Sequence, residues 1–150
     1  MTAVSDPAEP PRVDELLCFS VYSAGLALNQ LYRPLLEEIG LTYPQFLVMM
    51  ALWQREGGTV KDLGDALYLD SSTLTPLLKR LEAAGLISRT RNPRDERQVL
   101  LTVTDAGNGL REQAARVSSA IVDAIGLSPE TYETLRTGLD AIRNKIHGRT

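Results

Sequence analysis

One stretch of the chain decides its fold: TVKDLGDALYLDSSTLTPLLKRLEAAGLISRTRNPRDERQVLLTV, residues 59–103. Its first half carries two helix-start signals, because Thr59 and the run Asp70-Ser71-Ser72 both offer side-chain oxygens that cap helices. The first helix is predicted to end near Leu67 and the second near Gly85. The tight connection between them is typical of a helix-turn-helix.

The second half of the stretch changes its hydrophobic period from helical to alternating. Residues 86–91 and 98–103 are predicted to be two strands, and residues 92–97 the turn between them. Two short helices followed by a two-stranded hairpin predict a winged helix-turn-helix. The fold class is therefore mainly α with a small β-hairpin.

Helices are also predicted on both sides of this stretch. A long helix is expected from Asp14 to about Leu36, bent at Pro34. Thr42-Tyr43-Pro44-Gln45 has the spacing of a capping box and opens a helix to about Arg55. Two further helices are expected from Thr104-Asp105 to Ile125 and from Ser128-Pro129 to Ile146. The predicted organisation is a flexible tail (1–12) and a single domain (13–150), with dimerisation helices at 13–40 and 104–147 around a winged helix-turn-helix at 41–103.

The composition is that of a soluble globular protein, with 43% hydrophobic and 23% charged residues in 150. No apolar run is long enough to span a bilayer, and the first residues lack the pattern of a secretory signal, so the cytoplasm is the expected location. A net charge of −3 argues against nonspecific binding to polyanions. We expect neither a metal nor another cofactor, since His147 is the only histidine.

The charge is segregated along the chain. Residues 71–97 hold six basic against three acidic residues, whereas residues 1–40 hold six acidic against two basic ones. A local basic surface of this kind fits a protein that docks one face on DNA. The second helix of the motif is the expected recognition helix, and the hairpin carries arginines that suit a minor groove. The predicted DNA-binding residues are Ser71, Ser72, Thr73, Thr75, Lys79, Arg80, Arg91, Arg94 and Arg97.

Not every charge in this region needs to touch DNA. Asp95 is expected to form a salt bridge with Arg97 and hold the hairpin, because a carboxylate facing DNA would otherwise weaken binding. The alternative for the whole motif is a protein-binding adaptor with a solvated basic face, which would show no salt-dependent affinity for DNA.

Cys18 is the only cysteine and lies in an apolar run, Leu16-Leu17-Cys18-Phe19. One thiol cannot close an intramolecular disulfide, so Cys18 is either a small hydrophobic filler or a sensor that needs an outside partner.

Several motifs resemble the MarR family of regulators. The resemblance to the family rests on Asp95-Glu96-Arg97 followed by residues 101–107. Residues 67–82, 32–36 and 41–45 are similar to the organic hydroperoxide resistance regulators, a peroxide-sensing branch of that family, and the resemblance covers about residues 13 to 145. It implies that Cys18 senses peroxide and that Tyr32 and Tyr43 of the partner subunit hydrogen-bond its sulfur.

Helical geometry agrees with that arrangement. Cys18, Tyr22, Gly25 and Tyr32 fall on one helix face, but Cys18 and Tyr32 are ~21 Å apart along the axis. An antiparallel pairing of two copies that cross near Gly25 would bring Tyr32 of one protomer over Cys18 of its partner. Phenol hydroxyls would then favour the reactive thiolate, and Tyr22, one turn away, could join the pocket.

The resulting expectation is a homodimeric repressor that binds an inverted-repeat operator in double-stranded DNA. Oxidation of Cys18 by an organic hydroperoxide gives a sulfenic acid, which reacts with a low-molecular-weight thiol, forms a sulfenamide or over-oxidises. Release of the operator would derepress a peroxide-detoxification gene. A phenolic ligand could replace peroxide as the signal. A thiol peroxidase is disfavoured because turnover needs a resolving route, so we expect no enzyme activity.

Overall fold

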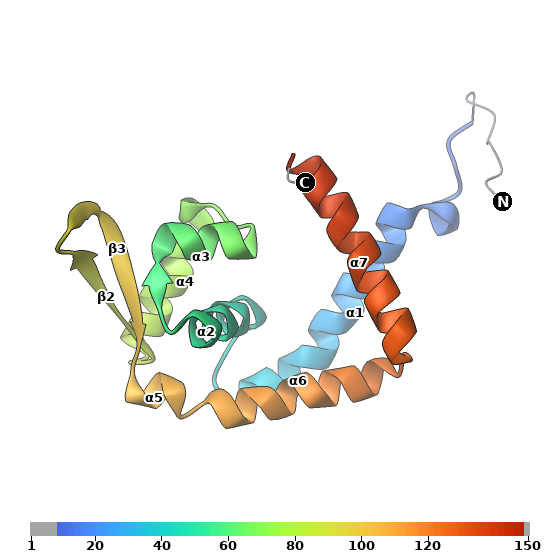
Figure 1. Ribbon diagram of the computed structural model, residues 1–150. Helices are drawn as coiled ribbons and strands as arrows, with labels where there is room; N and C mark the ends of the chain where they lie inside the picture. The colour runs from blue at the N-terminus through green and yellow to red at the C-terminus, as the bar shows by residue number, and fades with distance from the viewer. Residues whose placement is uncertain (1–8, 149–150) are drawn as a thin grey trace. The chain divides into compact units, whose positions relative to one another are not determined.

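The computed structural model describes residues 9–148, so most of the expected tail lies outside the described residues (Figure 1). The chain divides into two compact units, residues 1–114 and 115–150. The elements follow in the order η1 (Val13–Glu15), α1 (Leu17–Glu37), α2 (Tyr43–Arg55), β1 (Gly58–Thr59), α3 (Val60–Leu67), α4 (Ser71–Ala83), β2 (Ile87–Asn92), β3 (Asp95–Val103), α5 (Asp105–Asn108), α6 (Arg111–Ile125) and α7 (Pro129–Ile146).

The first long helix begins three residues later than predicted. Val13–Glu15 form a separate 3-10 turn, and Leu16 is extended with φ −81° and ψ 120° before α1 begins at Leu17. No side chain caps this start, since Leu16 has no hydrogen-bonding group to offer. The helix continues through Pro34 to Glu37. Cys18 is therefore the second residue of α1 rather than a residue of its interior.

The capping box predicted at the start of α2 is confirmed. The backbone N–H of Gln45 donates to Thr42 Oγ1 at 3.4 Å, and Thr42 N–H donates to Gln45 Oε1 at 2.9 Å. Phe46, Met49 and Trp53 are buried as predicted. Met50 is only half-buried. Helix α2 is in contact with α3 and α4 and therefore supports the helix-turn-helix.

The helix-turn-helix consists of α3 and α4. Thr59 caps α3 by accepting a hydrogen bond from Asp62 N–H at 3.1 Å. The turn passes close to α3, so a Cβ on Gly64 would come within 2.8 Å of the Leu69 carbonyl oxygen. Buried leucines from both helices fill the space beneath: Leu63, Leu74, Leu78 and Leu81.

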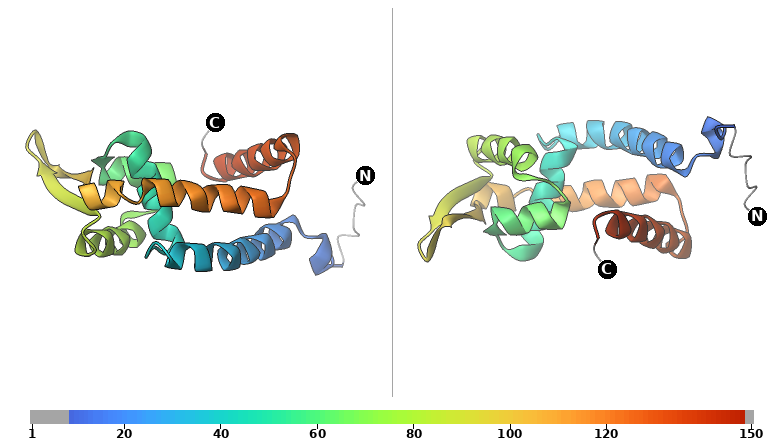
Figure 2. Two further views of the ribbon diagram at one scale, coloured as in Figure 1. Left: turned by 90° about the horizontal axis from the view of Figure 1, so that it is seen from below. Right: turned by 90° about the horizontal axis from the view of Figure 1, so that it is seen from above.

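The sheet has three strands rather than the predicted two, in the order β1-β3-β2. Gly58 and Thr59 form the unpredicted strand β1, which pairs with Leu101 and Leu100 of β3. The turn is also shorter than predicted, because Asn92 pairs with Asp95 across a connection of only two residues. The register then shifts, since Arg91 pairs with Val99, and Glu96, Arg97 and Gln98 form a bulge on β3. In both views of Figure 2 the hairpin extends beyond the helices of its own unit.

The helix predicted from residue 104 to 125 is broken into α5 and α6 around Gly109 and Leu110. Thr104 caps α5, and its hydroxyl also donates to the Gly85 carbonyl at 2.6 Å. A side chain on Gly107 would collide with the Leu86 carbonyl oxygen. These contacts fix the base of the hairpin against the end of α4.

The second unit contains most of α6 and all of α7. Ser128 caps α7 as predicted, with Thr131 N–H donating to its hydroxyl at 3.2 Å. Arg136 pairs with both Glu133 and Asp140, and Asp140 also pairs with Arg143. One stripe of α7 exposes the apolar residues Leu135, Leu139, Ile142 and Ile146. Among the described residues, no helix is long and apolar enough to cross a membrane.

Candidate nucleic-acid interface and sensor cysteine

The N-terminus of α4 presents the predicted hydroxyl residues, and Asp70 organises it. Asp70 Oδ1 accepts hydrogen bonds from Thr73 N–H at 2.9 Å and from the Ser72 hydroxyl at 2.7 Å. The Ser72 hydroxyl, followed by the Thr73 backbone, lowers the pKa of the Asp70 carboxyl from its ordinary 3.8. Ser71, Ser72 and Thr73 are all exposed. This end of α4 therefore offers small polar groups to a ligand without obstruction by large side chains.

The remaining predicted residues of α4 lie further along the helix. Lys79 and Arg80 are exposed, whereas Thr75 is half-buried. Arg80 lies in the last turn, where its charge also suits the negative end of the helix dipole.

A salt bridge joins α4 to the hairpin. Arg89 of β2 donates two hydrogen bonds to Glu82 Oε1, at 3.0 and 3.2 Å. The Arg89 hydrogen bonds hold the pKa of the Glu82 carboxyl below its usual range. Both side chains are only partly exposed. The pair therefore fixes the hairpin to α4, and the Arg89 side chain is occupied by Glu82.

The tip of the hairpin is held by side chains that contact the backbone. Asn92 Oδ1 accepts a hydrogen bond from Arg94 N–H at 3.0 Å, and Asn92 Nδ2 donates to Gln98 Oε1 at 2.8 Å. Asp95 holds the tip by a different contact from the predicted salt bridge, because its Oδ1 accepts the backbone N–H of Arg97 at 3.1 Å. The carboxylate can fold back in this way because Arg97 lies in the bulge.

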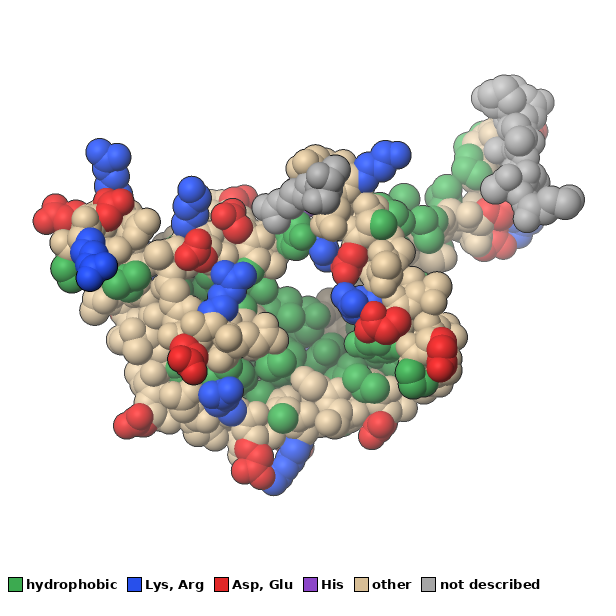
Figure 3. All heavy atoms as spheres, in the orientation of Figure 1, with side chains coloured by type: hydrophobic (Ala, Val, Ile, Leu, Met, Phe, Trp, Pro, Cys, Tyr) green, Lys and Arg blue, Asp and Glu red, His purple; other side chains and the backbone are tan. Residues whose placement is uncertain are grey.

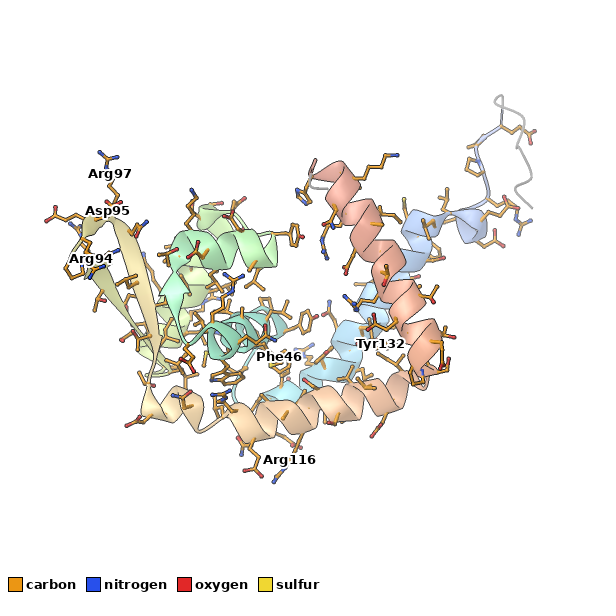
Figure 4. All side chains as sticks on the ribbon, viewed as in Figure 1. Phe46, Arg94, Asp95, Arg97, Arg116 and Tyr132 are labelled. Carbon is orange, nitrogen blue, oxygen red and sulfur yellow. The ribbon has the colours of Figure 1, made fainter. Side chains whose placement is uncertain are left out.

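The arginines of the hairpin face outward. Arg91, Arg94 and Arg97 are all exposed. Figure 4 shows Arg94 and Arg97 leaving the tip in different directions, with Asp95 between them. Figure 3 shows cationic and anionic side chains together at this tip. The hairpin thus has the form of a wing with exposed cations on a fixed support.

Cys18 lies at the other end of the unit, in the first turn of α1. It is a free thiol and is exposed. Apolar side chains around it are exposed as well: Leu17 at 60%, Phe19 at 42%, Val21 at 45% and Tyr22 at 66%. The first backbone N–H groups of a helix lack partners within the helix and carry partial positive charge. Cys18 therefore combines an accessible sulfur with an apolar surround and a helix N-terminus.

Tyr32 and Tyr43 come together in one cluster, apart from Tyr22. Their ring centroids are 4.7 Å apart, and Phe46 lies 5.8 Å from Tyr32 and 6.4 Å from Tyr43. Since α1 and α2 are in contact here, the two phenols are held side by side on a packed base. A pocket of about 460 Å³ adjoins Tyr43 and is lined by Asn29, Arg33, Leu36, Glu37, Leu41, Thr42 and Pro44.

Three residues of this surface lay outside the sequence prediction. Asn92 and Gln98 were missed because only the strand register brings them together. Lys61 was missed because its exposed position in the first turn of α3 gives no sequence signal of its own. Among residues 9–148, no group of acidic, histidine or cysteine side chains could hold a metal ion.

Comparisons with known proteins point to transcriptional regulators. The family described as Transcriptional regulator SarA/Rot matches residues 30–113. The organic hydroperoxide resistance transcriptional regulator of Bacillus subtilis is 40% identical over 91% of this chain and 92% of its own length. The HTH-type transcriptional regulator TtmR of Methylorubrum extorquens is 43% identical over 94% of this chain and 72% of its own length.

Solved structures of AbfR of Staphylococcus epidermidis are also similar. Reduced AbfR bound to DNA has a TM-score of 0.75 and 34% identity, covering 87% of this chain and 91% of that one. Over-oxidised AbfR bound to DNA has a TM-score of 0.74 and 35% identity, covering 85% and 90%.

Proposed function

The chain belongs to the MarR and SarA/Rot group of winged-helix transcriptional regulators, in the organic hydroperoxide resistance branch, and on this premise we propose that Cys18 is its peroxide switch. The observation that carries the proposal is the exposed thiol in the first turn of α1, among exposed apolar side chains. The positive end of the helix favours an anion such as a thiolate, and the apolar surround suits an organic hydroperoxide. The relatives are regulators, which assigns the chain to regulation rather than to peroxide turnover.

We propose that the reduced protein binds its operator as a homodimer. Ser71, Ser72, Thr73 and Thr75 face the major groove with Lys79 and Arg80, and Arg91, Arg94 and Arg97 face the minor groove. The support is the exposure of these side chains on α4 and on the wing, apart from the half-buried Thr75, together with the DNA-bound structures of AbfR. The bound state represses transcription.

The dimer is proposed to pair the exposed apolar faces of α1 and α7 with those of a second copy. Gly25 of α1 has open space where a Cβ would be, which leaves room for a close helix crossing. In that pairing Tyr32 and Tyr43 of one protomer reach Cys18 of its partner, and Tyr22 completes the pocket. A dimer structure in which Tyr32 lies far beyond hydrogen-bond reach of the partner's Cys18 would contradict this arrangement.

The proposed reaction has two balanced steps. The Cys18 thiolate attacks the terminal oxygen of the hydroperoxide and the O–O bond breaks. The cysteine becomes a sulfenic acid, and the alkoxide takes a proton from water and leaves as the alcohol. Since the chain has one cysteine, a low-molecular-weight thiol then displaces water and leaves a mixed disulfide. Because AbfR has been seen bound to DNA in its over-oxidised form, we propose the mixed disulfide rather than over-oxidation as the releasing product here. Its added bulk in a packed interface changes the spacing of the two α4 helices, on which half-site recognition depends.

The first test measures DNA binding by the full chain. Fluorescence anisotropy reports binding to a duplex from the intergenic region upstream of its own gene. Addition of an organic hydroperoxide with a low-molecular-weight thiol should abolish binding by the native chain and leave Cys18→Ser bound. If the native chain and Cys18→Ser bind the duplex equally well both before and after treatment, the proposal that Cys18 is the switch is wrong.

A second candidate signal is a phenolic ligand, favoured by the pocket beside Tyr43. Its lining joins apolar side chains to Asn29 and Arg33, groups that suit an aromatic acid. Arg33 also pairs with Glu37 at 3.3 Å, so an acid would compete with that carboxylate. Release of DNA by a phenolic acid in the Cys18→Ser variant would favour this candidate.

A further inference from the structure

A groove lies between the helix-turn-helix and the wing. It shares Ser71, Thr75 and Arg97 with the DNA-binding residues proposed above and adds Lys61, Arg89 and Gln98. Its volume is about 590 Å³. The α3 and α4 side includes Lys61, Ser71 and Thr75, and the strand side includes Arg89, Arg97 and Gln98. Helix α3 and strand β3, which both line the groove, are in contact with each other.

The position of the groove determines what would occupy it in a DNA complex. When α4 lies in a major groove and the wing reaches the next minor groove, one sugar–phosphate strand separates the two. That strand has to run between α4 and the hairpin, which is where this groove lies. The occupant is therefore a phosphate backbone rather than a base edge.

The charges that line the groove are not equally available. Arg89 is engaged by Glu82, and the Asp70 carboxylate accepts hydrogen bonds from Ser72 and Thr73. Asp65 also lines the groove and has an interaction of its own. Within residues 9–148, the side chains of Lys61 and Arg97 are not committed to any hydrogen bond or ion pair. Lys61 is exposed on the helix side and Arg97 on the wing side.

Lys61 has a second favourable feature. It is the second residue of α3, where the Thr59 cap engages the N–H of Asp62. The first backbone amides of a helix have no acceptor within the helix. A phosphate in the groove would meet both the ammonium group and the positive end of the helix.

We propose that this groove seats one sugar–phosphate strand of the operator and that Lys61 contacts a phosphate of it. The assignment rests on the proposed DNA-binding function. A phosphate contact fixes the position of the protein on DNA and carries no sequence information.

The test compares Lys61→Gln with the native full chain in fluorescence anisotropy, on operator and on scrambled duplex of equal length, at several salt concentrations. Lys61→Gln should weaken binding to both duplexes equally, by roughly tenfold. It should also reduce the slope of log K against log salt by about 0.9 for each phosphate that the variant no longer neutralises. Lys61→Arg should retain most of the affinity. Lys145→Gln, which removes the same charge from α7, is the matched control and should bind like the native chain.

Each other result overturns the assignment. Unchanged affinity and salt slope in Lys61→Gln would remove Lys61 from the interface, and a selective loss on operator DNA would make it a base contact. A native chain without salt-dependent DNA binding would overturn the proposed function itself, which distinguishes the two failures.

Discussion

At the residue scale, Asn92 determines how the wing arginines are presented. Its amide contacts the turn through Arg94 N–H and strand β3 through Gln98 Oε1, and Asn92 is half-buried among exposed neighbours. Because the bulge of Glu96, Arg97 and Gln98 lies where this amide joins β2 to β3, we propose that Asn92 positions the wing arginines for DNA.

Asn92→Ala should therefore weaken operator binding by about fivefold, the equivalent of one hydrogen bond. The effect should be much smaller in an Arg94→Ala background, because the amide acts through the arginine. Anisotropy titrations of the four proteins of this cycle measure the coupling, with Ser88→Ala on the same strand as the control. Additive effects in the double variant would contradict the positioning role.

At the element scale, α4 depends on its Asp70 cap. The Ser72 and Thr73 hydrogen bonds lower the pKa of this carboxyl in the folded chain, so its stabilisation is complete above the ordinary pKa of 3.8 and is lost as the pH falls through the lower folded value. Asp70→Ala should lower the melting temperature at neutral pH, while Asp70→Asn should retain it, since asparagine caps equally well.

Thermal melts at pH 7 and at about pH 3 check the sign of this effect. The gap between the native chain and Asp70→Ala should narrow in acid, because the native cap becomes protonated. A gap that stays constant or widens at low pH would show that the carboxylate does not stabilise α4 through these hydrogen bonds.

The elements also show which features a sequence can predict. The caps at Thr42, Thr59 and Ser128 were predicted correctly because each hydrogen bond spans three residues and depends only on local side chains. For α4 the sequence offered three candidates, Asp70, Ser71 and Ser72, and the structure selects Asp70. The start of α1 was predicted wrongly because the break at Leu16 has no local polar signal. Strand β1 and the bulge were missed because both depend on pairing with distant residues of β3.

In the candidate site too, the features that depend on local sequence could be predicted, and those that depend on tertiary contacts could not. The hydroxyls of α4 and the wing arginines follow from residue type and from position at a helix start or a hairpin. The Asp95 contact with the Arg97 backbone required the bulge geometry, and the Tyr32–Tyr43 stacking required the packing of α1 on α2.

At the scale of the whole molecule, the proposed switch connects an exposed thiol on α1 to the spacing of two α4 helices. The chain exposes apolar stripes on α1 and α7, which a lone protomer would leave in water. A second copy would bury them and enclose Cys18. In the proposed mixed-disulfide route, the single cysteine makes the response depend on an outside thiol, and we expect release of the operator only when that thiol is present.

The most direct measurement follows operator binding and intact protein mass in the same reaction after hydroperoxide and a low-molecular-weight thiol are added. We predict that binding disappears at the rate at which the mass of one thiol adduct appears on Cys18, and that a reductant reverses both changes. Release of the operator with no change in mass, or full adduct formation with the operator still bound, would contradict the proposed switch.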